Sequence, residues 1–322
     1  IYEAAHVMEH MAFGANARFK DEHEFEAEFT KNGAYHNAYT SDLSMVYIAT
    51  CADFEWERIF DLQRVSICQP RFSTDELEAE KGNVRSELTG YLNNHDRVLW
   101  PKVQQLLGED VLTFNQRLKT IQKVQLKHIK EHHARTHTAG NMRFVIAGKL
   151  HGRKSEIKRQ LEDWELAAGE RLEAPRDTFR SGKPTLIRRK EASNLTFAWS
   201  MIVPRELTDE ESDAMDCLDH ILTGTMHSRI YGAARKKGLA YGMSSDTSVA
   251  FHDSAWDFGG QVNLDTADAL FDIIVRELQS VMDGNISQAE IDAAKSYALG
   301  RHQMGAQTVA QISNFYTNRY FA

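Results

Sequence analysis

The sequence is short of cysteine, of positive charge and of long apolar runs. Its 322 residues include three cysteines, Cys51, Cys68 and Cys217. They are too few and too scattered for a disulfide framework or a cysteine-rich zinc site. Such a composition favours a reducing compartment such as the cytoplasm. The compartment itself stays open, because the chain begins at Ile1 and a targeting segment before that residue would not be seen.

Acidic residues outnumber basic ones, 46 against 38, so the formal net charge is −8. This excess would repel the phosphates of a nucleic acid, but it tolerates neutral or basic peptides. No apolar run approaches the roughly 18 residues that are typical of a membrane-spanning helix. The sequence therefore predicts neither a nucleic-acid partner nor a membrane span.

The chain is long enough for about two domains, each with its own core. Residues 173–183 are polar and contain Pro175 and Gly182, a composition that predicts a linker. The domains expected on either side of it are 1–172 and 184–322.

Apolar periodicity and capping residues predict a mixture of helices and strands in the first domain. Ser73 and Glu76 have the spacing of a capping box and predict a helix from about Asp75 to Leu88. The apolar run at residues 142–150 predicts a buried strand that closes the first sheet. The other elements expected are helices within 4–14, 22–33 and 53–67 and a pair of strands within 37–51.

Three short matches recur in the same order in the two halves and suggest an internal repeat. They pair ELEAEK with EIDAAK, TSDLSMVYIA with SSDTSVAFHD, and EHMAFG with DHILTG. Two unrelated halves of similar periodicity are the alternative. If the repeat is real, Ala294 stands where the first half has Glu80, and His6 has no histidine counterpart. A metal site would then belong to the first half only.

The stretch AAHVMEHMAFG carries two histidines and a glutamate on one short apolar helix. His6 and His10 are four residues apart and point the same way, with Glu9 beside them. Two imidazoles and a carboxylate on one helix face are what zinc and an activated water require. Histidines that are satisfied within an ordinary helix are the alternative. A second histidine-rich stretch, EHHARTHTAG, is expected to be a solvated helix end.

Two histidines leave zinc short of a protein ligand, which normally comes from a distant carboxylate or imidazole. The stretch ELEAEKGNVRSELTGY is rich in carboxylates. Its Glu80 and Glu87 are seven residues apart, two helical turns along one face. A solvated acidic face is the alternative explanation for this helix.

These features together resemble a known family. His-x-x-Glu-His is similar to the inverzincin signature of the pitrilysin and insulinase family, whose third zinc ligand is a glutamate about 75 residues further on. Glu87 lies at that distance from His10, and Glu80 matches a second glutamate that precedes the ligand. GAYHNAYTSD resembles the family's substrate strand, and ARKKGLAYGM resembles its Arg and Tyr motif. The chain resembles the half-size members, which include bacterial peptidases similar to the mitochondrial processing peptidase, and looks truncated at both ends.

The resemblance implies an α+β fold of two similar domains, each a mostly antiparallel sheet covered by helices, which together form one half of a clamshell. It implies one Zn²⁺ per chain, held by His6, His10 and Glu87, with Glu9 as the general base. It implies that Glu80 orients a ligand. The residues implied to meet the substrate are Asn37, Ala38, Tyr39 and Thr40 along a strand, and Tyr241 and Arg235 at the reacting carbonyl.

The Arg and Tyr motif departs from the family pattern, because Arg235 and Tyr241 are separated by one residue fewer than usual. Arg229 is the alternative arginine. In the family's clamshell, zinc and this motif lie in opposite bowls, so we expect a homodimer or a heterodimer with a related subunit. The expected function is a zinc-dependent metalloendopeptidase that cleaves peptides or unfolded polypeptides. A non-catalytic member that serves as a scaffold or partner subunit is the alternative.

Overall fold

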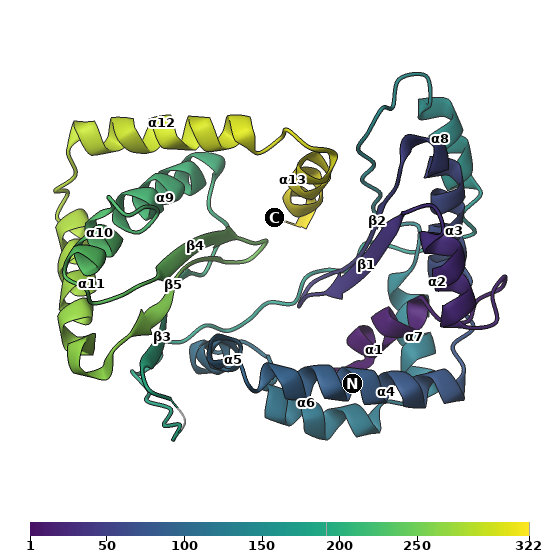
Figure 1. Ribbon diagram of the computed structural model, residues 1–322, viewed down its shortest axis with the longest axis horizontal. Helices are drawn as coiled ribbons and strands as arrows, with labels where there is room; N and C mark the ends of the chain where they lie inside the picture. Colours follow the sequence, from purple (N-terminus) through teal and green to yellow (C-terminus); the bar gives the residue numbers. More distant parts are fainter. Residues whose placement is uncertain (191, 322) are drawn as a thin grey trace. The chain divides into compact units, whose positions relative to one another are not determined.

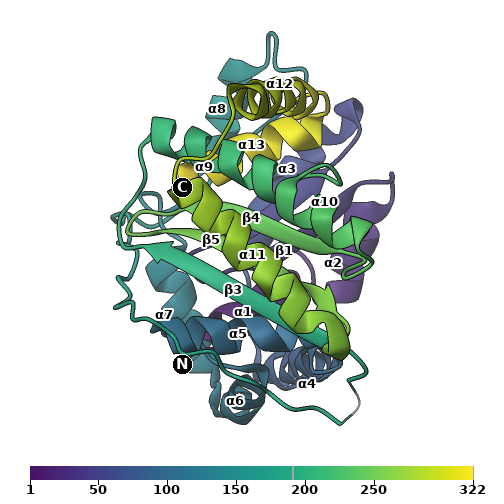
Figure 2. The same cartoon turned by 90° about the vertical axis from the view of Figure 1, so that its left-hand side faces the viewer.

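The computed structural model describes the backbone of residues 1–190 and 192–321 and the side chains up to residue 318, Glu191 excepted (Figures 1 and 2). The chain divides into two compact units. The first comprises Ile1–Asn93 and Leu112–Pro175, and the second comprises Asn94–Val111 and the chain from Arg176 on. Each unit combines helices with a small antiparallel sheet. The expected fold class, α+β with antiparallel sheets, is confirmed.

The first unit is built around the hairpin of β1 (Tyr35–Thr40) and β2 (Met45–Thr50). Its backbone register pairs Ala38 with Tyr47. A core of aromatic and aliphatic side chains, with Phe25 and Phe29 fully buried, packs between helices and hairpin. The helices of this unit are α1 (Ala4–Ala12), α2 (Glu22–Thr30), α3 (Trp56–Cys68), α4 (Thr74–Tyr91), α6 (Phe114–Thr120), α7 (Leu126–Thr136) and α8 (Lys154–Glu162), with short 3₁₀ helices η1 (Asp53–Glu55) and η2 (Ile121–Lys123).

The second unit contains a three-stranded sheet in the order β3–β5–β4, and α11 lies across one face of it (Figure 2). Alternate strand residues such as Phe197 and Phe258 point to that face and bury a core with Leu270 and Ile274 of α11. The strands are β3 (Leu195–Val203), β4 (Met243–Val249) and β5 (Ser254–Val262), and the helices are α5 (His95–Leu107), α9 (Asp209–Leu222), α10 (Arg229–Lys236), α11 (Ala267–Met282), α12 (Gln288–Met304) and α13 (Val309–Phe321), with the 3₁₀ helix η3 (Leu264–Thr266).

The same order of elements occurs in both units. α1, α2, β1, β2, η1, α3 and α4 follow one another as α9, α10, β4, β5, η3, α11 and α12 do. Capping boxes open both last helices, Ser73 with Glu76 in α4 and Ser287 with Glu290 in α12. The ELEAEK and EIDAAK match therefore falls at the same place in its two helices, and EHMAFG and DHILTG both run through a helix end. The expectation of two similar α+β halves agrees with this order.

The third sequence match does not align the two hairpins. Residues 40–49 hold the end of β1, the turn and most of β2, whereas 244–253 hold β4 and the turn that follows it. Strand patterns repeat every two residues, so they resemble one another in several registers and do not fix one.

The first unit is not continuous, in contrast to the expected domain 1–172. Helix α5 lies in the second unit because it packs against β3. Arg180, within the expected linker, caps the end of α5: its backbone N–H donates to Leu107 O (2.8 Å), and its guanidinium donates to Leu106 O (3.3 Å) and Gln105 O (3.0 Å). The predicted linker is thus attached to a helix that interrupts the first domain in the sequence.

The strand predicted at residues 142–150 is wrong. Within the part of the chain that the structure describes, β1 and β2 form a two-stranded sheet, and no strand pairs with 142–150. Phe144 instead packs its ring edge-to-face on Trp164, with the ring centroids 4.7 Å apart. An apolar run predicts burial of side chains, but a strand also needs a neighbour for its backbone groups. Among the described helices, none is both long and apolar enough to cross a membrane.

Removal of the capping box of α4 is predicted to lower the stability of the protein. Ser73→Ala should lower the free energy of unfolding by about 1 kcal/mol, because the N–H of Glu76 loses its acceptor at the start of α4. Ser73→Asn is the matched control, since its side-chain oxygen can accept the same hydrogen bond and asparagine is about as favourable as serine at an N-cap. Urea unfolding followed by circular dichroism measures both. Equal losses for the two variants would contradict a role for the cap.

Candidate functional site

Helix α1 presents two histidines on the face opposite its core side. Its apolar side chains are buried, among them Val7, Met8 and Met11. His6 and His10 lie on the remaining face and are partly exposed, and their rings meet edge-to-face with centroids 5.1 Å apart. The alternation of buried and partly exposed residues at helical spacing therefore directs both imidazoles to one side of the helix.

Helix α4 packs against α1 and brings two glutamates to the histidines. Val84 and Leu88 are fully buried on one side of α4. Glu76 links the first turn of α4 to the end of α1. Its carboxylate accepts a hydrogen bond from the N–H of Ala15, just after α1 (2.6 Å). Glu80 and Glu87 then lie beside α1, two turns apart as the sequence predicts.

The expected ligand atoms converge. Glu87 Oε2 lies 3.4 Å from His6 Nε2 and 3.6 Å from His10 Nε2. One ligand atom from each residue lies within 4.8 Å of the other two. Among the described residues, this is the one group of three or more His, Cys, Asp or Glu side chains with such proximity.

The Nδ1 atoms of the two rings face carboxylates on their other side. Glu80 Oε2 lies 3.0 Å from His10 Nδ1, and Asn83 donates to both oxygens of Glu80. Glu3 Oε2 lies 3.4 Å from His6 Nδ1. Glu80 was expected behind the site, whereas Glu3 was missed by the sequence analysis. A carboxylate that accepts Nδ1–H leaves the Nε2 lone pair for a metal.

Opposite charges dominate the electrostatics of this cluster. Burial alone would lower the pKa of His10, but hydrogen bonds to Glu80 and Glu87 raise it to about 9. The pKa of His6 is raised as well, because hydrogen bonds to Glu3 and Glu87 outweigh its burial. Hydrogen bonds from His10 and His6 hold the pKa of Glu87 well below its usual range. The surroundings thus stabilise positive charge where the two Nε2 atoms and Glu87 meet.

The donor set fits Zn²⁺. Two imidazole nitrogens and one carboxylate oxygen are common ligands of catalytic zinc sites, which keep a further position open. The carboxylates at both Nδ1 atoms are the partners that such histidines usually have. The negative charge that stabilises a proton on these rings would equally stabilise a dication.

Glu9 lies next to the cluster and is held by the hairpin. The residue is 9% exposed, and its Oε2 accepts a hydrogen bond from Thr40 Oγ1 at the end of β1 (2.5 Å). Thr40 was expected to meet the substrate; the structure brings it to Glu9. The bond fixes one carboxylate oxygen and leaves the other for a proton.

The rest of β1 is arranged as an edge strand within the described chain. Asn37 turns its side-chain oxygen back to the N–H of Ala38 (2.9 Å), Ala38 is buried and Tyr39 is exposed. One side of β1 pairs with β2, and no described strand lies on the other. Such an edge can accept an extended peptide through backbone hydrogen bonds.

Tyr241 and Arg235 lie together in the second unit. Tyr241 is 89% exposed, and the Arg235 guanidinium lies over its ring, 5.0 Å from the centroid. Arg235 also donates to the carbonyl of Tyr241 (3.1 Å). Arg229, the alternative arginine, is engaged elsewhere, because it forms a two-pronged ion pair with Glu290.

The stretch EHHARTHTAG is not the solvated helix end that was expected. His137 is buried, and Tyr47 on β2 lies in hydrogen-bond contact with its Nε2 (2.9 Å). His133, one turn earlier, stacks on His137 and reaches Ile67 O. Burial, with some repulsion from His133 and His132, lowers the pKa of His137 to about 3. The four-residue spacing of His133 and His137 indicates that both side chains lie on the same face of a helix.

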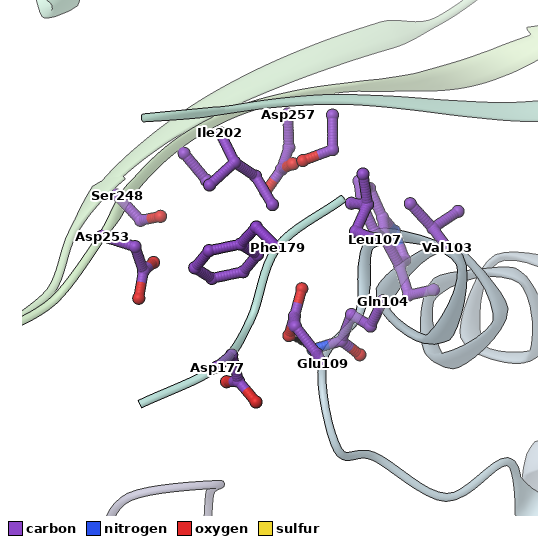
Figure 3. A pocket seen from close by; sticks show the side chains of 13 residues that line it. Val103, Gln104, Leu107, Glu109, Asp177, Phe179, Ile202, Ser248, Asp253 and Asp257 are labelled. Carbon is purple, nitrogen blue, oxygen red and sulfur yellow. Dashed lines mark hydrogen bonds between the residues drawn. The ribbon is translucent and has the colours of Figure 1, made fainter. Parts of the chain in front are cut away.

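The second unit has a cavity of about 290 Å³ between α5, the chain after Pro175 and the sheet face that α5 covers (Figure 3). Figure 3 shows Phe179 in its centre, between the side of α5 and Ile202 of β3. Asp177, Asp253 and Asp257 also line it. Its lining residues include no histidine, cysteine, lysine or arginine, so this cavity lacks the imidazole donors of the histidine site.

Two family models match the chain and between them span most of it. The one described as "Insulinase (Peptidase family M16)" matches residues 3–133. The one described as "Peptidase M16 inactive domain" matches residues 123–297. The histidines and Glu87 lie within the first match, and Tyr241 and Arg235 lie within the second.

Two curated proteins are similar in sequence. The beta subunit of mitochondrial-processing peptidase from Caenorhabditis elegans is 31% identical over 96 residues, which are 30% of this chain and 21% of that protein. A nardilysin-like protein from Arabidopsis thaliana is 25% identical over 309 residues, 84% of this chain and 28% of that protein. These matches span about a quarter of the length of the two proteins.

A solved structure of a protease from Helicobacter pylori has a similar fold. Its TM-score is 0.81 at 19% sequence identity, over 99% of this chain and 79% of that chain. This likeness supports the α+β fold of the chain.

The buried His137 predicts a dependence of stability on pH. Its folded pKa of about 3 lies below the ordinary 6.5, so its contribution is complete above pH 6.5 and is lost as the pH falls towards 3. Between pH 7 and 5 the wild type should lose about 2 kcal/mol more unfolding free energy than His137→Gln, which cannot titrate. Urea unfolding at several pH values measures the difference. His23→Gln controls for loss of a histidine at an exposed position, and equal slopes for wild type and His137→Gln would contradict the assignment.

Proposed function

The chain belongs to the insulinase family of peptidases, family M16, and from this premise we propose that it is a zinc-dependent endopeptidase acting on peptides or unfolded polypeptides. The observation that carries the proposal is the convergence of His6 Nε2, His10 Nε2 and Glu87 Oε2 beside the buried carboxylate of Glu9. Side chains from two separate helices meet there with the donor types of a catalytic zinc site.

One Zn²⁺ per chain would be held by His6, His10 and Glu87. When bound, zinc supplies Lewis acidity that lowers the pKa of water towards neutrality and polarises a peptide carbonyl. Glu80 orients the imidazole of His10 from behind through its Nδ1 atom.

Glu9 is the proposed general base. It accepts a proton from the attacking water and passes it to the leaving amine, which needs a carboxylate that is near the reacting atoms but not a metal ligand. Thr40 steadies Glu9 by donating to Oε2, so that the other oxygen takes part in proton transfer. The hydrogen bond thus couples the base to the end of the substrate strand.

The substrate is proposed to add along the edge of β1, at Asn37, Ala38 and Tyr39. Recognition through backbone groups reads an extended chain and depends little on its side chains. The net charge of −8 is compatible with neutral or basic peptides.

Tyr241 is proposed to donate a hydrogen bond to the oxyanion that forms during attack, with Arg235 positioning it through the contact with its ring. The high exposure of Tyr241 leaves its phenol accessible to a second chain. We therefore infer a dimer, in which Tyr241 of one chain serves the zinc site of the other. One relative is named as a beta subunit, which supports a heterodimer with a related partner as the alternative to a homodimer.

The alternative function is that of a non-catalytic partner subunit. One matching family model is described as an inactive domain. That match begins at residue 123, whereas the histidines, Glu9 and Glu87 all lie in the range of the other model, 3–133. A complete set of donors and base favours catalysis, and zinc content together with peptide cleavage separates the two.

Substitution of Glu9 tests the chemistry. Glu9→Gln should keep the fold and bound zinc but lose at least about 100-fold in peptide turnover, because an amide cannot accept the proton. His10→Ala should lose the metal as well. Zinc content by mass spectrometry and cleavage of a peptide mixture, with and without chelator, are the measurements. Near-normal turnover by Glu9→Gln would exclude it as the base, and chelator-resistant cleavage would exclude the metal mechanism.

Mixing of two inactive variants tests action between chains. Glu9→Gln and Tyr241→Phe mixed in equal amounts should recover roughly a quarter of wild-type turnover, because half of the dimers are mixed and each contains one intact site. Glu9→Gln mixed with the double variant Glu9→Gln/Tyr241→Phe is the control and should recover nothing. Full activity of the wild type at concentrations where sedimentation shows a monomer would rule the dimer out.

A further inference from the structure

Glu3 is a buried carboxylate with no part in the family signature or in the capping of its own helix. It occupies the N-cap position of α1, yet its side chain makes no capping hydrogen bond. Its side chain is 0% exposed. Burial of an ionised carboxylate is costly unless it is paired and hydrogen-bonded. Two side chains in the structure pair with the carboxylate of Glu3.

The first partner is Arg117 on α6. Arg117 Nε donates to Glu3 Oε1 (2.6 Å), and its NH2 group donates to Glu3 Oε2 (3.0 Å), the forked geometry of a strong ion pair. The guanidinium also lies over the rings of Tyr2 and Phe114, at 5.7 and 5.6 Å from their centroids. Both ends of the pair are therefore held in place.

The second partner is His6. Its Nδ1 lies 3.4 Å from Glu3 Oε2 and 3.3 Å from the NH2 group of Arg117. A guanidinium has no acceptor, so a hydrogen on Nδ1 can be accepted only by Glu3 of these two. With the hydrogen on Nδ1, the lone pair of His6 lies on Nε2, the atom that faces Glu87 (3.4 Å). Glu80 does the same for His10.

We propose that Glu3 and Arg117 are positioning residues for the zinc site: Glu3 fixes the tautomer and orientation of His6, and Arg117 keeps Glu3 in place. This inference rests on the proposed zinc function. It identifies a matched pair of carboxylates, Glu3 and Glu80, one behind each histidine.

Zinc affinity, measured by competition with a chromophoric chelator at neutral pH, tests the proposal. Glu3→Gln should weaken zinc binding by about 10–100-fold, the usual effect of removing a partner behind a metal-bound histidine. The double variant Glu3→Gln/Arg117→Met should bind zinc as weakly as the single one, because Arg117 acts through Glu3. It also removes both charges, so that no unpaired ion stays buried if the single variant folds poorly.

Glu290→Gln is the matched control. Glu290 forms an ion pair of the same forked geometry with Arg229 in the second unit, at 2.6 and 2.7 Å. Its loss should leave zinc affinity at the wild-type value. Substitution of Co²⁺ for zinc gives a second measurement, because its visible absorption depends on ligand geometry and should change in Glu3→Gln but not in Glu290→Gln.

The outcomes distinguish failure of the positioning role from failure of the zinc function. Tight zinc binding by the wild type together with unchanged affinity in folded Glu3→Gln/Arg117→Met would overturn the positioning role alone. Equally weak binding by the wild type and His10→Ala would overturn the zinc function, and this inference with it.

Discussion

The docking of α4 against α1 is the contact on which the candidate site depends. Neither helix holds a site by itself: α1 supplies His6 and His10, and α4 supplies Glu87. The two helices pack against each other, and each buries apolar side chains, Val84 and Leu88 on α4 and Met8 and Met11 on α1. Apolar burial is the main favourable term in folding. Loss of this packing would therefore separate the donors.

Charge is arranged in layers around the same contact. Glu87 lies between the two Nε2 atoms, carboxylates face both Nδ1 atoms, and Arg117 balances the most deeply buried of them, Glu3. Arg117 orients Glu3, and Glu3 and Glu80 in turn orient the imidazoles of His6 and His10 towards Glu87. Glu9 lies on α1 together with the two histidines, but the residue that orients it, Thr40, comes from β1.

Local patterns in the sequence predicted the elements that carry the site, because helical spacing and the Ser73–Glu76 capping box are read from neighbouring residues. Alternation in strands predicted the hairpin but misaligned it with its counterpart, since a two-residue period has many registers. Contacts between distant residues could not be read this way. Glu3 and Arg117, like Tyr47 and His137, are far apart in the sequence, and neither pair has a spacing that marks it.

The attachment of α5 to the second unit has a consequence for synthesis. α5 precedes α6, α7 and α8 of the first unit in the chain, yet it packs against β3 and is capped by Arg180. On the ribosome, a chain folds from its N-terminus as it emerges. The apolar side of α5 therefore has no packing partner until the segments around Arg180 and β3 have been synthesised. The first unit can complete its own fold during that interval, with α5 looped out of it.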